Sequence, residues 1–172
     1  MSRAQHAKAI LMLPFVAIVV IPAILLWNFG GIDLQYLSNY PVNLIMLSTG
    51  AFLLIDGFIL LGLTISLFAN VGQGTLSPLT PTKKLVVDGI YRHTRNPMIG
   101  GVVFILLGET LMLGAGILLL WTLFFLFGNH FYFIYSEEPG LEKRFGEDYL
   151  VYKANVPRWF PRRSPWILEF ED

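Results

Sequence analysis

Apolar residues fill four long segments of the chain, and polar residues collect between them. A helix needs about 20 apolar residues to cross roughly 30 Å of hydrocarbon. The segments that approach this length are residues 10–29, 42–68, 98–113 and 117–135. The pattern predicts an all-α integral membrane protein with four transmembrane helices, in a single domain of 172 residues.

The ends of these segments carry further signals. A signal peptide is an alternative for the first segment, because Arg3 and Lys8 precede its apolar run. We interpret the segment as a membrane helix, since the run is long for a signal peptide and no small-x-small cleavage site follows. Residues 114–116 leave room only for a tight turn, so the last two segments are expected to form a hairpin.

The basic residues indicate how the helices are oriented, because cytoplasmic loops are enriched in Lys and Arg. With four spans, the N-terminus, the 69–97 loop and the C-terminal tail lie on one side, and the 30–41 loop lies on the other. The first side carries all the basic residues of the chain: Arg3, Lys8, Lys83, Lys84, Arg92, Arg95, Lys143, Arg144, Lys153, Arg158, Arg162 and Arg163. We therefore expect both termini in the cytoplasm.

The tail, residues 137–172, predicts a C-terminal amphipathic interfacial segment. Its apolar residues recur at helical spacing: Leu141, Phe145, Tyr149 and Tyr152. Charged residues occupy the other face, so we expect the apolar face to lie on the cytoplasmic membrane surface. Gly146 is expected to divide the segment into two short helices.

Composition supports a membrane protein and excludes some functions. The chain is 55% hydrophobic and 14% charged, against about 25% charged in soluble domains. Its net charge of zero gives no general attraction to nucleic acid. The absence of cysteine excludes disulfides, thiolate nucleophiles and cysteine metal sites, and we expect no metal.

Two acidic residues, Asp56 and Glu109, lie inside the apolar segments. Counting about 1.5 Å per residue places both near the membrane midplane at similar depth. A carboxylate is costly there, and two close together would share a proton. Either each is protonated and satisfies a local hydrogen bond, or the pair lines a cavity for substrate.

His130 lies in the last turns of the fourth segment, seven residues before Glu137. This spacing predicts that both lie on one helix face. Aromatic residues surround them: Phe131, Tyr132, Phe133 and Tyr135. The histidine is either a packing residue beside an aromatic belt, or part of a ligand site with Glu137.

The C-terminal half carries a connected series of motifs. They are GQGT at 72–75, SPLTP at 77–81, LVVDGIYRHTRNPM at 85–98, His130, YSEEPGL at 135–141, FGEDY at 145–149, Tyr152 and VPR at 156–158. In this order around a membrane hairpin, they resemble the isoprenylcysteine carboxyl methyltransferase family and its bacterial relatives, within the wider phospholipid N-methyltransferase group. The resemblance covers about residues 70–163.

The resemblance implies an integral-membrane methyltransferase that uses S-adenosyl-L-methionine and acts on a lipophilic or membrane-embedded acceptor. It places the cofactor at the cytosolic ends of the last helices and implies a tunnel that admits substrate from the bilayer. The implied cofactor-binding residues are Tyr91, His93, Arg95, Asn96, Pro97, Met98, His130, Tyr135, Glu137, Glu138 and Arg158. Arg95 and Glu138 are the candidate catalytic residues, and Asp56 and Glu109 the candidate substrate-binding residues.

The chemistry of these side chains agrees with the resemblance. The carboxylates of Glu137 and Glu138 accept hydrogen bonds from an ammonium or a ribose, and the guanidinium of Arg95 or Arg158 pairs with a carboxylate. Methyl transfer is an in-line displacement, which needs positioning and exclusion of water more than acid–base chemistry.

One departure from the family concerns the acceptor. The eukaryotic enzymes have His and Tyr at the positions of Asn96 and Ile99, whereas an Asn-Pro pair is familiar in the bacterial relatives. The cofactor interpretation is unaffected, but the case for prenylcysteine as the acceptor is weaker.

Two other functions remain open. An intramembrane NADPH-dependent sterol or steroid-type reductase has a related C-terminal arrangement and needs a basic site for the 2′-phosphate. A non-enzymatic transporter or proton relay would use Asp56 and Glu109, and it leaves the motifs of the C-terminal half unexplained. The sequence predicts neither the acceptor group nor the oligomeric state.

Overall fold

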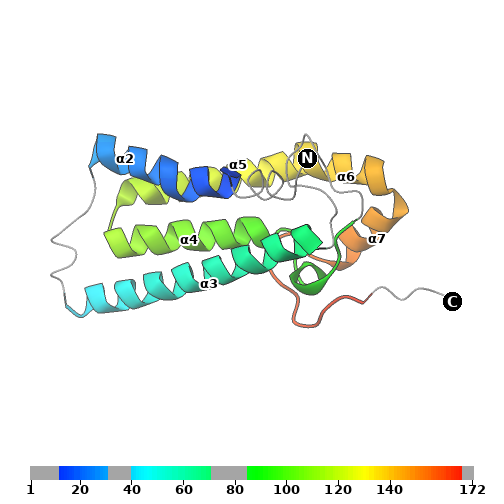
Figure 1. Cartoon of the computed structure of the whole chain (residues 1–172), viewed down its shortest axis with the longest axis horizontal. Helices are drawn as coiled ribbons and strands as arrows, with labels where there is room; N and C mark the ends of the chain where they lie inside the picture. Colours follow the sequence, from blue (N-terminus) through cyan, green and yellow to red (C-terminus); the bar gives the residue numbers. More distant parts are fainter. Residues whose placement is uncertain (1–11, 31–39, 71–84, 168–172) are drawn as a thin grey trace.

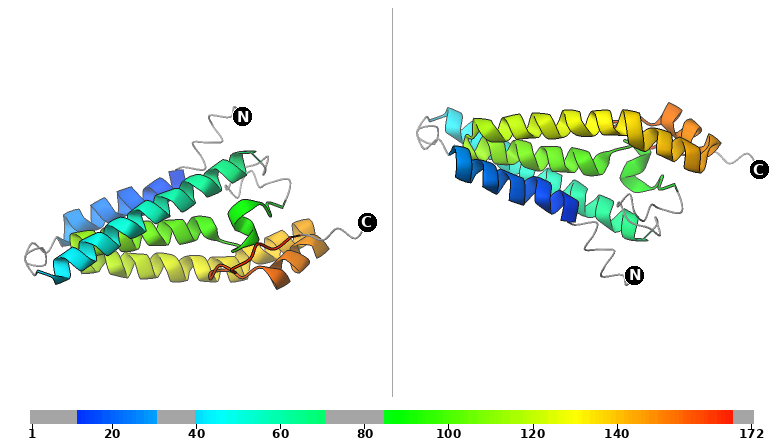
Figure 2. Two further views of the ribbon diagram at one scale, coloured as in Figure 1. Left: turned by 90° about the horizontal axis from the view of Figure 1, so that it is seen from below. Right: turned by 90° about the horizontal axis from the view of Figure 1, so that it is seen from above.

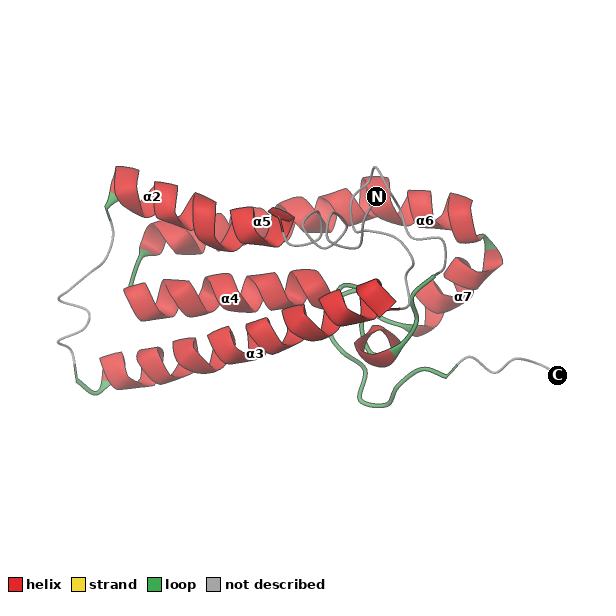
Figure 3. Cartoon of the chain, viewed as in Figure 1, coloured by secondary structure: helices red, strands yellow, loops and turns green. Residues whose placement is uncertain are grey.

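The structure is a computed structural model that describes residues 12–30, 40–70 and 85–167, so the GQGT and SPLTP motifs lie outside the described residues. The described residues form helices joined by loops, which confirms the all-α prediction (Figure 3). The long helices run side by side in an elongated bundle, and the short helices and the C-terminal segment gather at one end (Figures 1 and 2).

The helices follow the apolar segments closely. The first helix, Met12–Phe29, contains the π-helical η1 (Val16–Val20) and α2 (Ile21–Phe29). It is followed by α3 (Val42–Asn70), the 3-10 helix η3 (Gly89–Arg92), α4 (Pro97–Leu113) and α5 (Gly116–Tyr132). The chain ends with the π-helical η4 (Phe133–Glu137), α6 (Glu138–Phe145) and α7 (Glu147–Asn155). Helices α4 and α5 form the expected hairpin.

Three of the described helices are long and apolar enough to cross a membrane. They are Met12–Phe29, Val42–Leu67 and Gly116–Phe145, the last of which runs without a break through α5, η4 and α6. Helix α4 has 17 residues and a length of roughly 25 Å, short of the hydrocarbon thickness. The membrane character is therefore supported, and the fourth span stays a prediction.

Polar elements gather at one end of the bundle. Helices α6 and α7 lie there, beyond the end of α3 and the start of α4 (Figure 1). The basic residues of the described part belong to elements at this end: Arg92, Arg95, Lys143, Arg144, Lys153, Arg158, Arg162 and Arg163. This agrees with the predicted segregation of charge, while the cytoplasmic orientation stays a prediction.

Helices α3 and α4 touch backbone to backbone at two glycine pairs. A Cβ on Gly57 would lie 2.7 Å from the carbonyl oxygen of Gly101. Two helical turns away, a Cβ on Gly108 would lie 2.8 Å from the carbonyl oxygen of Gly50. Small residues permit such close approach of membrane helices, which association by dispersion requires.

The register of this contact corrects the expected depth of the two membrane carboxylates. It places Asp56 and Glu109 about five residues apart along the helix axes, roughly 7 Å. The buried Oε2 atom of Glu109 has no hydrogen-bond partner among the described residues. The two residues are therefore offset along the bundle, and a shared proton between them stays a prediction.

The first helix is held against α5 by a hydrogen bond to a backbone carbonyl that Pro22 leaves without a donor in its own helix. In η1 the N–H of Ile21 donates to the carbonyl of Val16, a separation of five residues. The carbonyl of Ala17 would then need a donor at position 22, and Pro22 has no N–H. The indole Nε1 of Trp121 in α5 donates to this carbonyl instead, at 3.0 Å.

The tail folds differently from the amphipathic segment that we expected. Gly146 has a φ of 55°, which divides the tail into α6 and α7 as predicted. The two helices then turn their apolar faces inward, on the protein. They form a small core: Tyr149, Tyr152 and Val156 are buried, packed by Leu85, Val87, Leu141, Phe145 and Trp166. The apolar face thus packs within the protein and is not free to lie on a membrane.

We predict that Gly57→Ala lowers the free energy of unfolding by about 1–3 kcal/mol, because the added Cβ overpacks the contact with α4. Gly62→Ala is the matched control on the same helix, since a Cβ there meets nothing within 4 Å. Denaturant unfolding in mixed micelles measures both. Equal stability of the two variants would contradict the backbone contact.

Candidate functional site

A cavity of about 550 Å³ lies between the first helix, the start of α4 and α5. Cavities of about 300–1,000 Å³ are typical of small-molecule sites. Its lining residues are Leu13, Pro14, Val16, Ala17, Ile21, Tyr91, Arg95, Asn96, Met98, Ile99, Val102, Trp121, Phe125, Asn129, Tyr132, Phe133 and Glu137. The cavity is therefore built from segments more than 100 residues apart in the sequence.

The lining changes from apolar to polar along α5 and its continuation. Trp121 and Phe125 face the first helix at the apolar end, and Asn129 comes one turn later. Glu137 lies at the polar end, where Arg95 and Asn96 come from the loop before α4. A molecule that fills this cavity would have a polar part at the charged end of the bundle and an apolar part within it.

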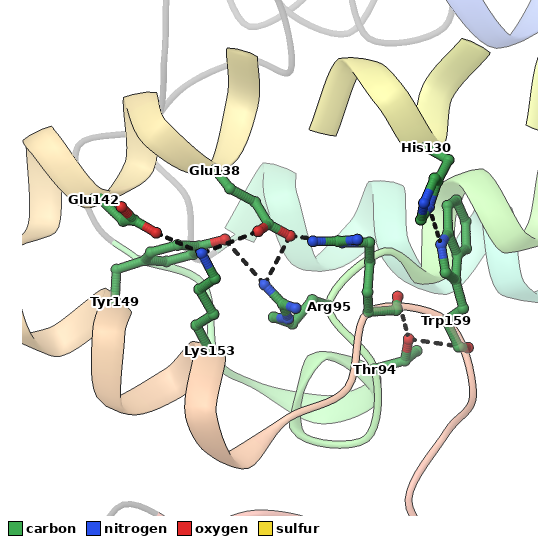
Figure 4. A network of polar contacts seen from close by, with 9 residues as sticks. Thr94, Arg95, His130, Glu138, Glu142, Tyr149, Lys153 and Trp159 are labelled. Carbon is green, nitrogen blue, oxygen red and sulfur yellow. Dashed lines mark hydrogen bonds and ion pairs between the residues drawn. The ribbon is translucent and has the colours of Figure 1, made fainter. Parts of the chain in front are cut away.

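The carboxylate of Glu138 organises the polar end of the bundle (Figure 4). Its Oε1 accepts hydrogen bonds from Arg95 Nη1 at 2.9 Å and from Arg158 Nε at 2.7 Å. Its Oε2 lies 3.3 Å from Lys153 Nζ. Because Glu138 is 4% exposed, these cations compensate a buried charge, which is costly when it is left unpaired.

The pKa values of residues around Glu138 are raised, which keeps the cations charged and the tyrosine neutral. The hydrogen bond to Glu138 raises the pKa of the Arg158 guanidinium. The hydrogen bond to Glu142, at 2.6 Å, raises the pKa of the Lys153 ammonium. Burial raises the pKa of Tyr149, so its neutral hydroxyl receives the second hydrogen bond of Arg95 Nη1, at 3.3 Å.

Arg95 connects this network to the cavity. Its side chain is 10% exposed, and its Nη1 is committed to Glu138 and Tyr149. Its buried Nε has no hydrogen-bond partner among the described residues. An unpaired donor on a buried guanidinium is unfavourable, so the cavity holds a charged group that lacks an acceptor.

The C-terminal segment fixes the backbone that carries Arg95. The N–H of Arg95 donates to the carbonyl of Pro157 at 2.9 Å, and Thr94 Oγ1 donates to the carbonyl of Arg158 at 3.0 Å. His93 Nδ1 lies 2.8 Å from the carbonyl oxygen of Arg162. The loop before α4 is therefore clamped by residues more than 60 positions later in the chain.

The structure brings together five of the predicted cofactor residues at the cavity: Tyr91, Arg95, Asn96, Met98 and Glu137. The other six do not line it: His93, Pro97, His130, Tyr135, Glu138 and Arg158. Pro97 instead occupies the first turn of α4, where its missing N–H costs nothing. His93 is occupied with the C-terminal segment.

Glu138 and Arg158 have different places from those expected. We expected Glu138 to act as a catalytic residue and Arg158 to bind the cofactor carboxylate. The structure pairs them with each other, and the carboxylate of Glu138 is surrounded by cations of this chain. This ion pair holds the side chain of Arg95 in place, and the catalytic role of Glu138 and the cofactor role of Arg158 stay predictions.

His130 and Tyr135 also differ from the prediction, because the helix between them is not a regular α-helix. In η4 the N–H of Glu138 donates to the carbonyl of Phe133, five residues earlier, which adds a residue to the turn. The assumption that His130 and Glu137 share a face is therefore wrong. His130 Nδ1 accepts from Trp159 Nε1 at 3.0 Å, and Tyr135 is 76% exposed.

The two predicted substrate residues are not part of this cavity. Neither Asp56 on α3 nor Glu109 on α4 lines it. The cavity lies on the opposite side of α4, between the first helix and α5.

Sequence reasoning missed the contribution of the first helix. Its five lining residues, Leu13, Pro14, Val16, Ala17 and Ile21, look like any apolar membrane segment. The only local signal was Pro22, which frees a carbonyl that needs a partner. Asn129 also lines the cavity, and the sequence analysis assigned it no role.

Comparison with known proteins gave one informative result. The family model described as phospholipid methyltransferase matches residues 42–148. No curated protein and no solved structure matched the chain. The matched region begins with α3 and ends in α7, so it includes Arg95, Glu137 and Glu138 but not the first helix.

We predict that Glu138→Gln lowers the free energy of unfolding by about 3 kcal/mol, because it leaves two half-buried guanidinium groups without a counter-charge. Glu142→Gln is the control, since the side chain of Glu142 is 34% exposed and pairs with Lys153 alone, a contact worth about 1 kcal/mol or less. Denaturant unfolding in micelles compares them. Similar losses in the two variants would refute the central role of Glu138.

Proposed function

The chain belongs to the phospholipid methyltransferase family, and from this premise we propose that it transfers a methyl group from S-adenosylmethionine to a lipophilic acceptor within the membrane. Family membership supports a methyltransferase. The cofactor and the acceptor class are our proposal. The cavity supports them, because it joins a charged end to an apolar interior between helices that are suited to a membrane.

One observation carries the cofactor assignment: the polar end of the cavity offers a cation and an anion that this chain leaves available. The buried Nε of Arg95 has no partner among the described residues, and the carboxylate of Glu137 lines the same cavity. The amino-acid part of S-adenosylmethionine carries a carboxylate and an ammonium. These groups complement Arg95 and Glu137 in charge and in hydrogen bonding.

Each lining group then has a defined task. When bound, S-adenosylmethionine supplies an electrophilic methyl group on a positively charged sulfur. Arg95 would hold its carboxylate and Glu137 its ammonium, while the rings of Tyr132 and Phe133 attract the positive charge. The apolar walls exclude water and orient the acceptor for in-line transfer. The acceptor need not be prenylcysteine, because Asn96 stands where the eukaryotic isoprenylcysteine enzymes have histidine.

The two rival functions have less support. A reductase needs a cluster of cations for a 2′-phosphate, whereas Arg95 is the one basic residue among the described residues that line the cavity. A transporter or proton relay needs Asp56 and Glu109 in a common pathway, whereas the two are separated along the helix axes and lie outside the cavity.

We expect Glu137→Gln to weaken S-adenosylmethionine binding by roughly tenfold to a hundredfold, the effect of losing one charge-assisted hydrogen bond. Glu147→Gln is the control, because Glu147 is exposed at the start of α7. Calorimetric titration of the purified proteins measures both affinities. An unchanged affinity of Glu137→Gln would remove the cofactor assignment.

The proposal also includes orientation, with the cofactor end of the bundle in the cytoplasm. A single cysteine introduced at exposed Ser164 should react with an impermeant maleimide only after the cells are opened. A cysteine at Ser38, in the loop without basic residues, should react in intact cells. The natural chain has no cysteine, so the background is clean. Reaction of both sites from one side would overturn the orientation.

A further inference from the structure

The first helix lies outside the family-matched region, yet it forms one wall of the cavity. Its lining side chains are Leu13, Pro14, Val16, Ala17 and Ile21, all apolar. The facing wall at this end has Val102 of α4 and Trp121 and Phe125 of α5. The indole N–H of Trp121 is already bonded to Ala17, so the described residues at this end offer no free polar side chain to a ligand.

We infer that this apolar end holds the hydrocarbon chain of the lipid acceptor, and that Ala17 limits the chain length that fits. The inference rests on the proposed function, because it takes the reacting end of the acceptor to lie near Arg95 and Glu137. From Glu137 to Trp121 the continuous helix spans about 16 residues, roughly 24 Å. In the proposed function the cofactor takes the polar part of this span, and the remainder, lined by Val102, Trp121 and Phe125, suits an elongated apolar group.

An occupant from the bilayer is favoured by the surroundings of the cavity. Leu13 lines the cavity and is also 61% exposed, so the wall borders the surface that faces lipid. A hydrocarbon chain needs no hydrogen bonds and gains by contact with these side chains. A polar molecule of the same length would leave its groups unpaired at this end.

Ala17 is the position where the wall is smallest and least able to move. Its side chain lines the cavity and the residue is 7% exposed. Its carbonyl oxygen is held by Trp121 Nε1 at 3.0 Å, in a register that Pro22 imposes. A larger side chain at this position therefore takes volume from the cavity, because the backbone is prevented from moving away.

Two substitutions change the cavity in opposite directions. Ala17→Leu fills the apolar end and should shift selection toward shorter chains. Phe125→Ala opens it and should shift selection toward longer chains. Ala23→Leu is the control, because Ala23 is exposed on the same helix and does not line the cavity. Each methylene group that no longer fits should lower preference about fourfold.

The experiment uses the full chain in nanodiscs that contain equal amounts of phosphatidylethanolamines with acyl chains of 12, 14, 16 and 18 carbons. After transfer to detergent, the lipids retained by each variant are released and counted by chain length with mass spectrometry. Methylated products are counted in the same way after incubation with S-adenosylmethionine. Calorimetric affinity for the cofactor checks that each variant is folded.

Opposite shifts in the retained lipids of Ala17→Leu and Phe125→Ala, with Ala23→Leu like the wild type, support the inference. A shift in retained lipids without methylation of any lipid would reject the proposed function and leave the chain-length limit standing. Profiles of retained lipid that are identical in all four proteins would overturn the inference.

Discussion

The polar end of this protein depends on the charge of one buried carboxylate. Glu138 begins α6, and it receives cations from the loop before α4, from α7 and from the C-terminal segment. A carboxylate in this position is stable only when it is paired, so these separate segments must converge on it. Their convergence commits Nη1 of Arg95, a residue that lines the cavity, to Glu138, while its Nε has no partner among the described residues.

The helix bundle provides a rigid apolar interior beside the polar cluster of Glu138 and its cations. Close glycine contacts fix α4 against α3, and the bond from Trp121 to Ala17 fixes the first helix against α5. The cavity lies between the first helix, α4 and α5, and Arg95 is among its lining residues. A reaction between a charged donor and a lipid needs this combination, because the two reactants have opposite preferences for water.

The two π-helical segments, η1 and η4, change the direction of helix groups that contribute to the site. In each, a five-residue π-helical segment ends two positions before a proline, Val16–Val20 before Pro22 and Phe133–Glu137 before Pro139. The proline removes a donor from the helix, and the extra residue per turn rotates the rest of the helix about its axis. The first segment frees a carbonyl for Trp121, and the second separates the directions of His130 and Glu137.

The sequence alone determined the apolar helices, the hairpin of α4 and α5, the break at Gly146 and the family, because these depend on local composition and on the order of motifs. It could not separate Glu137 from Glu138, which are adjacent and chemically identical. Only the tertiary structure decided that Glu138 meets the cations and that Glu137 lines the cavity. The cause is the rotation introduced by η4, together with the return of the C-terminal segment, which depends on contacts between residues distant in the chain. The sequence also could not predict that the first helix forms a wall of the cavity. Its apolar residues are the same whether they face lipid or another helix.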